Sequence, residues 1–281
     1  MRQFRSIVPL LLTALGGCQP PLDSEARHAA EVRQTDAPPS DSRPDPSGLG
    51  QQDVAPFALP ASYASARAAL LAGGWLPLRD AGCWANVGGR ADVCNVLPET
   101  EACSSDGHCV MHFGHVEQAT VLRVTTYGDW SRWSLEGRDG LQVASSQASS
   151  VEAAPALACP ASTFDGFLAA FASSEATRIA FTAPLVRVAE LNSTEDGDFS
   201  REVLMRGREY AGFNVRHEGD AFRFVDAEGR IDPSPLPLDI GRTRNTYMVR
   251  YQYGMSEGNE YVFVAHAGCW RLVADPEPPT P

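Results

Sequence analysis

The chain has 281 residues, with 35 acidic and 23 basic side chains and a formal net charge of −12 at neutral pH. Every basic residue is an arginine, because the sequence contains no lysine. An acidic chain of this kind is a poor candidate for binding nucleic acid or for electrostatic adhesion to anionic lipid. Its length leaves room for one large domain or two small ones.

The N-terminus is predicted to be an export signal. Arg2 and Arg5 give a positive start, and a short apolar run follows over 7–15. This run is too short to cross a bilayer as a helix, which takes about 20 apolar residues. The residues "LGGC", ending at Cys18, resemble the lipobox of bacterial lipoproteins. The resemblance implies a signal peptide over 1–17 and a lipid on Cys18.

The lipobox resemblance also implies a location. Gln19 follows the cysteine, whereas an aspartate there marks retention in the inner membrane of enteric-type bacteria. We therefore expect a cell-envelope protein, held by its acyl chains in the outer membrane and facing the periplasm. An ordinary secreted protein with a chance cysteine is the alternative.

Six cysteines remain after Cys18, an even number that predicts three disulfides in an oxidising compartment. Four of them fall within 27 residues, and the other two lie near the ends of a later segment. Sequence alone allows 15 pairings. A zinc site is disfavoured, because no two cysteines have the close two-residue spacing of zinc ligands. The preferred pairs are Cys83 with Cys94, Cys103 with Cys109, and Cys159 with Cys269.

Composition predicts how the chain is divided. The proline-rich stretch 18–55 has few bulky apolar residues and is expected to be a disordered tether. The last residues, 276–281, are expected to be a disordered tail. Alanine and serine dominate 142–158, which we interpret as a linker between two domains at 56–141 and 159–275.

The domain at 56–141 is predicted to be a small α+β unit, with a helix on an antiparallel sheet. Ser62 can cap a helix over 63–72, which Gly73 and Gly74 would end. A looped stretch with four cysteines follows over 81–107. Residues rich in β-branched side chains then predict three strands, at 109–113, 119–128 and 130–137.

The domain at 159–275 is predicted to begin with a helix and to end with antiparallel strands. Ser162 and Asp165 have the spacing of a capping box. Four apolar side chains then recur at helical spacing: Phe164, Phe167, Leu168 and Phe171. Alternation in "NTYMVRYQYG" predicts a half-buried strand, with Tyr247, Val249, Tyr251 and Tyr253 on one face. Two more strands flank a turn at Gly268.

The opening "FDGFLAAF" and the closing "CWRLV" of this second domain resemble the nuclear transport factor 2-like cone, in its uncharacterised bacterial branch. Family members that are ketosteroid isomerases or polyketide cyclases place Asp, His or Tyr inside a pocket. The resemblance makes Tyr251, Tyr253 and His266 the candidate pocket residues. The alternative is that the tyrosines are core aromatics and that His266 lies at a sheet edge.

No motif for acyl transfer, zinc peptidase chemistry or nucleotide binding is present, and no cofactor is expected. The favoured hypothesis is a non-catalytic envelope lipoprotein that binds a protein partner or a small apolar ligand. An enzyme that uses the pocket of the cone is the alternative.

A third hypothesis is metal handling through three histidines, His108, His112 and His115, in "HCVMHFGH". Three imidazoles suit a borderline metal ion. On a strand, however, His108 and His112 would be roughly 13 Å apart, too far for one ion unless the backbone folds back. The interpretation that these are ordinary histidines near a hairpin is favoured.

Overall fold

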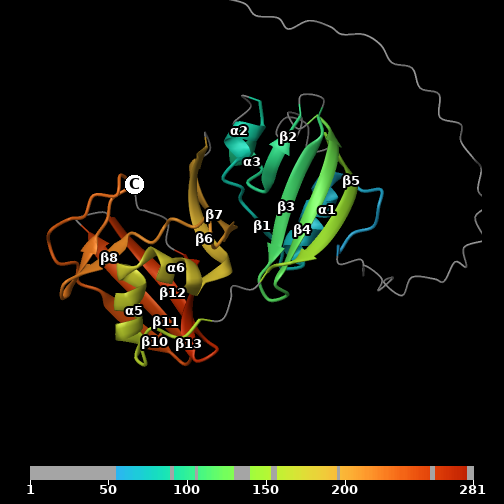
Figure 1. The fold of residues 1–281 in the computed structure, drawn as a ribbon. Coiled ribbons are helices and arrows are strands. Elements are labelled where there is room, and N and C mark those ends of the chain that lie inside the picture. The colour runs from blue at the N-terminus through green and yellow to red at the C-terminus, as the bar shows by residue number, and fades with distance from the viewer. Residues whose placement is uncertain are drawn as a thin grey trace, which may run out of the picture. The chain divides into compact units, whose positions relative to one another are not determined.

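A computed structural model describes the following residues: 55–88, 92–104, 107–129, 140–152, 157–194, 197–253 and 257–276, with the side chains of 192–199 and 257 excepted. All of them belong to one compact unit, Gly50–Pro281. The predicted signal peptide, Cys18, nearly all of the predicted tether and most of the predicted tail lie outside the described residues. The described part is α+β: mostly strands in several antiparallel or mixed sheets, with a few helices (Figure 1).

The first sheet has the strand order β1-β3-β4-β5, and β2 also pairs with β3. All of its pairings are antiparallel. Its strands are β1 (Leu76–Pro77), β2 (Thr100–Cys103), β3 (Cys109–His115), β4 (Thr120–Gly128) and β5 (Leu141–Ser150).

Helix α1 (Tyr63–Ala72) covers one face of this sheet, as predicted. The Ser62 hydroxyl accepts a hydrogen bond from the backbone of Ser65, and the helix ends at Gly73. Its buried side chains pack against the alternate residues of β3 and β4 that face the helix, which leaves the other face of the sheet for a different partner. The buried side chains of α1 are Tyr63, Ala66 and Leu70.

The third large strand differs from the prediction. The predicted strand at 130–137 lies outside the described residues, and β5 takes the place beside β4. The first part of the predicted linker, 142–158, is therefore a strand. The sequence did not predict this strand, because β5 is an edge strand rich in serine, glutamine and alanine and lacks the apolar alternation typical of a buried strand. The looped stretch 81–107 also holds two short helices, α2 (Cys83–Asn86) and α3 (Asp92–Val96).

The second sheet has the strand order β10-β11-β12-β13-β6-β7 and is antiparallel except where β13 meets β6. Its strands are β6 (Thr182–Thr194), β7 (Gly197–Arg206), β10 (Asp239–Thr243), β11 (Thr246–Tyr253), β12 (Glu257–His266) and β13 (Cys269–Asp275). A separate hairpin consists of β8 (Val215–Glu218) and β9 (Ala221–Phe224). The predicted tyrosine-rich strand and the pair around Gly268 are confirmed as β11, β12 and β13.

Two consecutive helices precede this sheet, α5 (Phe164–Ser173) and α6 (Glu175–Phe181) (Figure 1). The predicted apolar stripe of α5 is confirmed as buried. The cap is one residue later than predicted, because the Thr163 hydroxyl, and not that of Ser162, accepts from the backbone of Gly166.

The structure contains the three disulfides in the preferred pairing. Their Cα atoms are 6.0 Å apart in Cys83–Cys94, 4.1 Å in Cys103–Cys109 and 5.3 Å in Cys159–Cys269. The last bridge ties the segment before α5 to the start of β13, 110 residues later. Among the described residues, no helix is both long and apolar enough to cross a membrane.

Candidate functional site

The structure does not bring the three candidate pocket residues together. Tyr251 is buried on β11, where its hydroxyl donates to the Asn214 side chain at 2.5 Å. The Tyr253 ring stacks on Phe224, with centroids 4.1 Å apart. His266 is exposed at the β12–β13 turn, seven residues along β12 from the partner of Tyr251, or roughly 23 Å away.

Aromatic side chains fill the space between α5 and the second sheet. Phe164 stacks on Tyr247 with ring centroids 3.9 Å apart, and Phe171 meets Phe213 and Phe263 edge to face. The tyrosines of the β11 face are therefore part of a packed core.

A polar cluster is buried at one end of this core. The Tyr210 hydroxyl donates to Asp275 at 2.7 Å, and the Tyr261 hydroxyl donates to the carbonyl of Gly212 at 3.0 Å. Burial, and then the Asp275 carboxylate, raise the pKa of Tyr210 well above its ordinary value. Tyr210 also lines a cavity of about 300 Å³ together with Phe171 and other residues.

The three candidate metal ligands do not converge. His108 is exposed, while His112 is paired with Glu101 at 2.6 Å. His115 packs against Trp75, with ring centroids 5.4 Å apart. His112 and His115 are three residues apart on β3 and so lie on opposite faces of the sheet. Among the described side chains, no group of three or more potential ligands could hold a metal ion.

The described residues also form a cleft of about 610 Å³ with a mixed polar and apolar lining. Its floor is the face of the first sheet that α1 does not cover, and its wall comes from α6 and the adjoining ends of β6 and β7. We call this the cleft. Its lining residues are His112, Val121, Arg123, Gln147, Ser149, Ser150, Val151, Glu152, Ile179, Thr182, Ala183, Pro184, Leu185, Arg206, Gly207 and Arg208.

Strand register arranges the floor of the cleft in two rows. His112, Arg123 and Gln147 are direct cross-strand neighbours and form a polar row. The next row on the same face consists of Gly114, Val121 and Ser149. Leu204 and Leu185 pack closely over Gly114, where an added Cβ would lie 2.5 Å from Leu204, whereas Val121 and Ser149 line the cleft.

The wall of the cleft is apolar near the sheet and basic at the rim. Leu185 is buried against the floor, while Ile179 on α6 is 56% exposed. Gly207 allows β6 and β7 to approach closely, because a Cβ there would lie 2.0 Å from the carbonyl oxygen of Ala183. The neighbouring Arg206 and Arg208 then project from the end of β7 into the lining.

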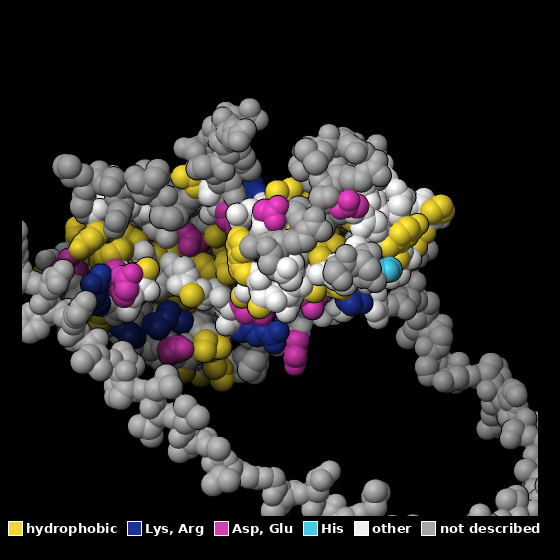
Figure 2. Space-filling model, turned by 90° about the horizontal axis from the view of Figure 1, so that it is seen from above, with side chains coloured by type: hydrophobic (Ala, Val, Ile, Leu, Met, Phe, Trp, Pro, Cys, Tyr) yellow, Lys and Arg dark blue, Asp and Glu magenta, His cyan; other side chains and the backbone are white. Residues whose placement is uncertain are grey.

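Three arginines and one acid, Glu152, line the cleft, whereas acids outnumber arginines in the chain as a whole. Arg206 lies 3.4 Å from Asp80, and the exposed Arg208 lies 3.4 Å from Glu209. No described acidic side chain forms an ion pair with Arg123. On the face shown in Figure 2, arginines lie among acidic and apolar side chains.

His112 contributes a neutral ring to the cleft. Burial lowers its pKa, although the hydrogen bond to Glu101 opposes this effect. Its Nε2 faces the Glu101 carboxylate, while its Nδ1 is buried and has no hydrogen-bond partner in the structure. A molecule in the cleft cannot reach Nδ1 without a movement of the ring, so His112 is poorly placed to act as a general base.

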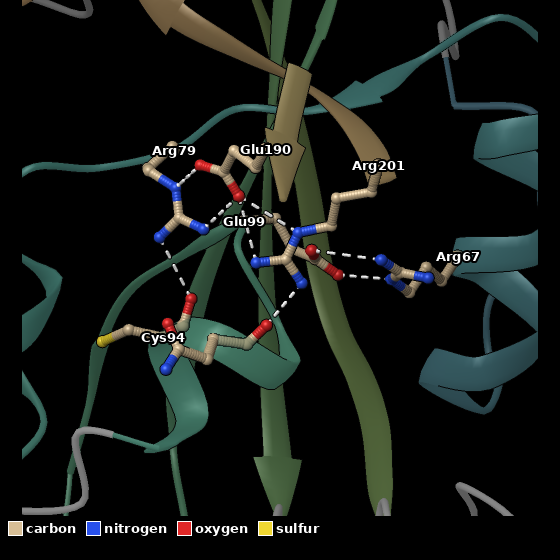
Figure 3. Close-up of polar contacts among 7 residues, drawn as sticks. Arg67, Arg79, Cys94, Glu99, Glu190 and Arg201 are labelled. Atoms are coloured by element: carbon tan, nitrogen blue, oxygen red, sulfur yellow. Dashed lines mark hydrogen bonds and ion pairs between the residues drawn. The ribbon is translucent and has the colours of Figure 1, made fainter. Parts of the chain in front are cut away.

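Two neighbouring groups of ion pairs lie where the β6–β7 hairpin meets the first sheet and α1 (Figure 3). Arg79 binds Glu190 through two nitrogens and the carbonyl of Cys94 at 3.1 Å, and Arg201 contacts Glu190 at 3.1 Å. Figure 3 shows the Arg201 side chain between the Glu190 and Glu99 carboxylates. We use the name buried ion cluster for Arg67, Arg79, Glu99, Glu190 and Arg201.

Glu99 is the most deeply buried member of this cluster, with a fully covered side chain. Arg67 binds it at 2.5 Å, and the Tyr63 hydroxyl donates to it at 2.7 Å. Burial, and then the Glu99 carboxylate, raise the pKa of Tyr63 well above its ordinary value, which keeps the hydroxyl protonated as a donor.

Apolar contacts reinforce the same junction. Leu78, Leu185 and Leu204 form a small buried cluster, and the strands meet at a bridge between Leu78 and Leu204. The backbone of Arg79 also donates to the carbonyl of Leu204 at 2.8 Å. The wall and the floor of the cleft are therefore held together by ion pairs, hydrogen bonds and packing.

Sequence reasoning missed the cleft and its arginines. The alternation around Arg123 marks a strand with a polar second face, but nothing local indicates what covers that face. The residues that cover this face belong to α6, β6 and β7 and follow Arg123 by at least 50 positions in the chain. Comparison with known proteins adds no assignment, because no family model, curated protein or solved structure matches the chain.

Proposed function

We propose that this chain is an exported bacterial lipoprotein that binds a small ligand in the cleft without transforming it. A cleft of about 610 Å³ with an apolar wall and a few polar side chains carries the proposal. Small-molecule sites are commonly hollows of about 300–1,000 Å³ with such a lining. The proposal places the ligand on the first sheet, and not inside the cone.

Anchoring is the second part of this proposal. The "LGGC" motif supports lipidation of Cys18 and attachment to the outer membrane, facing the periplasm. Three disulfides agree with folding outside the cytoplasm. Replacing Cys18 by Ser should move the protein from the membrane fraction to the soluble fraction, measured by fractionation and immunoblotting. A variant that stays with washed membranes would contradict the anchor.

Binding is favoured over catalysis because Glu152 is the one carboxylate among the lining residues, and no hydrogen bond or ion pair of the described residues couples it to a second titratable group. His112 is the one titratable ring in its lining, and its free nitrogen is buried. The guanidinium groups of the lining arginines can donate hydrogen bonds to a ligand. The arrangement can hold and orient a molecule, but it does not supply a proton-transfer pair.

We also propose that the second half is a nuclear transport factor 2-like cone. The support is its order of elements, with α5 and α6 first and their apolar side chains packed on a sheet that closes with β13. An enzyme working at the cone is a second candidate function, favoured by the partly buried hydrogen bond from Tyr210 to Asp275 beside the smaller cavity. Replacing Tyr210 by Phe would abolish such an activity while leaving ligand binding in the cleft intact.

The cleft can be tested with a probe and a filling substitution. The full chain with Cys18→Ser, which needs no detergent, is titrated with the uncharged fluorophore N-phenyl-1-naphthylamine. Ser149→Phe places a ring on the cleft floor and should weaken binding at least tenfold, because the ring occupies the space of the probe. Ala144→Phe is the matched control, since Ala144 is an exposed small residue of the same strand outside the cleft. Equal binding by both variants would contradict the proposal.

A further inference from the structure

We infer that the ligand of the cleft is a small amphipathic anion, one negatively charged group on an apolar chain or ring. This inference rests on the proposed function and adds the chemical class of the ligand. It follows from the distribution of charge and apolar surface among the lining residues.

The charge of the lining points to an anion. Arg123, Arg206 and Arg208 line the cleft with one acid, Glu152, and Arg206 and Arg208 each lie 3.4 Å from a further acid, Asp80 and Glu209. A guanidinium without an acidic partner attracts anions in a chain whose net charge is −12, because the surrounding acids repel them elsewhere. Arg123 has no acidic partner among the described residues, so its guanidinium is available to a carboxylate or phosphate oxygen.

The apolar part of the ligand is indicated by the wall. Ile179 leaves more than half of its surface exposed beside the cleft, and Val121 and Val151 are half-buried on the floor. Covering such surface gains about 25 cal/mol per Å². A purely inorganic anion would leave this surface in water, whereas a chain or ring attached to the anion would cover it.

The two floor rows give the ligand an orientation. Arg123 and Val121 are two residues apart on β4, so their side chains leave the same face of the sheet about 7 Å apart. An anionic head at Arg123 therefore places its apolar part over Val121 and toward Ile179. The cleft also shares Ile179, Thr182, Gly207 and Arg208 with the cavity of about 300 Å³ beside it, which gives a longer apolar group room to extend.

Two matched fluorophores separate charge from apolar contact. The probe 8-anilino-1-naphthalenesulfonate carries the ring system of N-phenyl-1-naphthylamine together with a sulfonate. In the Cys18→Ser chain, the double substitution Arg123→Gln and Arg208→Gln should weaken binding of the sulfonate probe about tenfold, the loss expected for charge-assisted hydrogen bonds. Binding of the uncharged probe should change less than twofold. Arg187→Gln, an exposed arginine of β6 outside the cleft, should leave both unchanged.

Displacement then tests the ligand class. Octanoate should displace the sulfonate probe at lower concentration than either acetate or 1-octanol, because only octanoate has both parts. Equal displacement by 1-octanol, or equal weakening of both fluorophores by the arginine substitutions, would overturn the inference and leave the proposed function standing. If neither fluorophore binds the unsubstituted cleft, the proposed function itself fails.

Discussion

Arginine side chains have different roles in the buried ion cluster and in the cleft. In the buried ion cluster, each arginine meets a carboxylate: Arg67 meets Glu99, and Arg79 and Arg201 share Glu190. In the cleft, Arg123 has no described acidic partner and is exposed. The arginines of the buried ion cluster therefore have a structural role, because an unpaired buried charge would lower the free energy of unfolding.

The difference shows where the protein can accept a charge from outside. An arginine paired with a carboxylate inside the protein is poorly accessible to a ligand, and removal of its partner would destabilise the fold. An exposed arginine without a partner contributes little to folding but is ready to bind an anion. The following substitutions test that distinction, from the largest expected effect to the smallest.

Glu99→Gln should destabilise the fold most strongly. Removing the carboxylate leaves the Arg67 charge without its buried partner, and breaking such a pair costs about 3–5 kcal/mol. The measurement is chemical denaturation of the full chain. Glu202→Gln is the control, because Glu202 forms an exposed pair with Arg187 and its loss should cost at most about 1 kcal/mol. Equal losses would show that burial does not distinguish the two pairs.

Leu204→Ala should loosen the junction that forms the cleft. Leu204 is fully buried between Leu78 and Leu185, and truncating a buried leucine costs about 2–5 kcal/mol. Binding of N-phenyl-1-naphthylamine should weaken as well, because the wall loses its support. Leu191→Ala, at a 39% exposed position of β6, should leave both denaturation and probe binding nearly unchanged.

His112→Gln should reduce the sensitivity of the fold to acid. Burial lowers the pKa of His112 in the folded chain, so the unfolded chain binds the proton more readily. The stability contributed by neutral His112 is present above its ordinary pKa of about 6.5 and is lost as the pH falls toward the folded value. The charged groups that act on it are Glu101, Asp80 and Arg206, and Arg123 is its cross-strand neighbour.

The measurement for this substitution is the midpoint of urea denaturation between about pH 7.5 and 5. The native chain should lose stability over this range, and His112→Gln should lose less. His108→Gln, at an exposed position, is the control and should follow the native curve. A native-like pH dependence in His112→Gln would show that other groups cause the acid sensitivity.

Arg123→Gln should have the smallest effect on folding, within about 0.5 kcal/mol, because the side chain is exposed and has no described acidic partner. Thermal denaturation measures this effect. The same variant should still weaken the sulfonate probe, which separates a binding role from a structural one. A loss of stability close to that of Glu99→Gln would remove the contrast between the two groups of arginines.

Local patterns determined much of this protein. The cap at Ser62, the apolar stripe of α5 and the alternating tyrosines of β11 were predicted correctly, because each depends on residues close in sequence. The cysteine pairing was one preferred choice among 15, and its longest bridge joins residues 110 positions apart. The edge strand β5 was not predicted, because its exposed sequence lacks the alternation of apolar and polar residues.

The cleft and the buried ion cluster could be identified only from the tertiary structure, because their residues are far apart in the sequence. Glu190 and Arg79 are 111 residues apart in the sequence, and Arg206 in the cleft wall follows Arg123 in the floor by 83 residues. Sequence reasoning placed the candidate pocket among the tyrosines, whose rings instead fill a core. Composition identifies which side chains can bind an anion, but the packing of distant strands decides which of them are neutralised inside the protein and which remain open to a ligand.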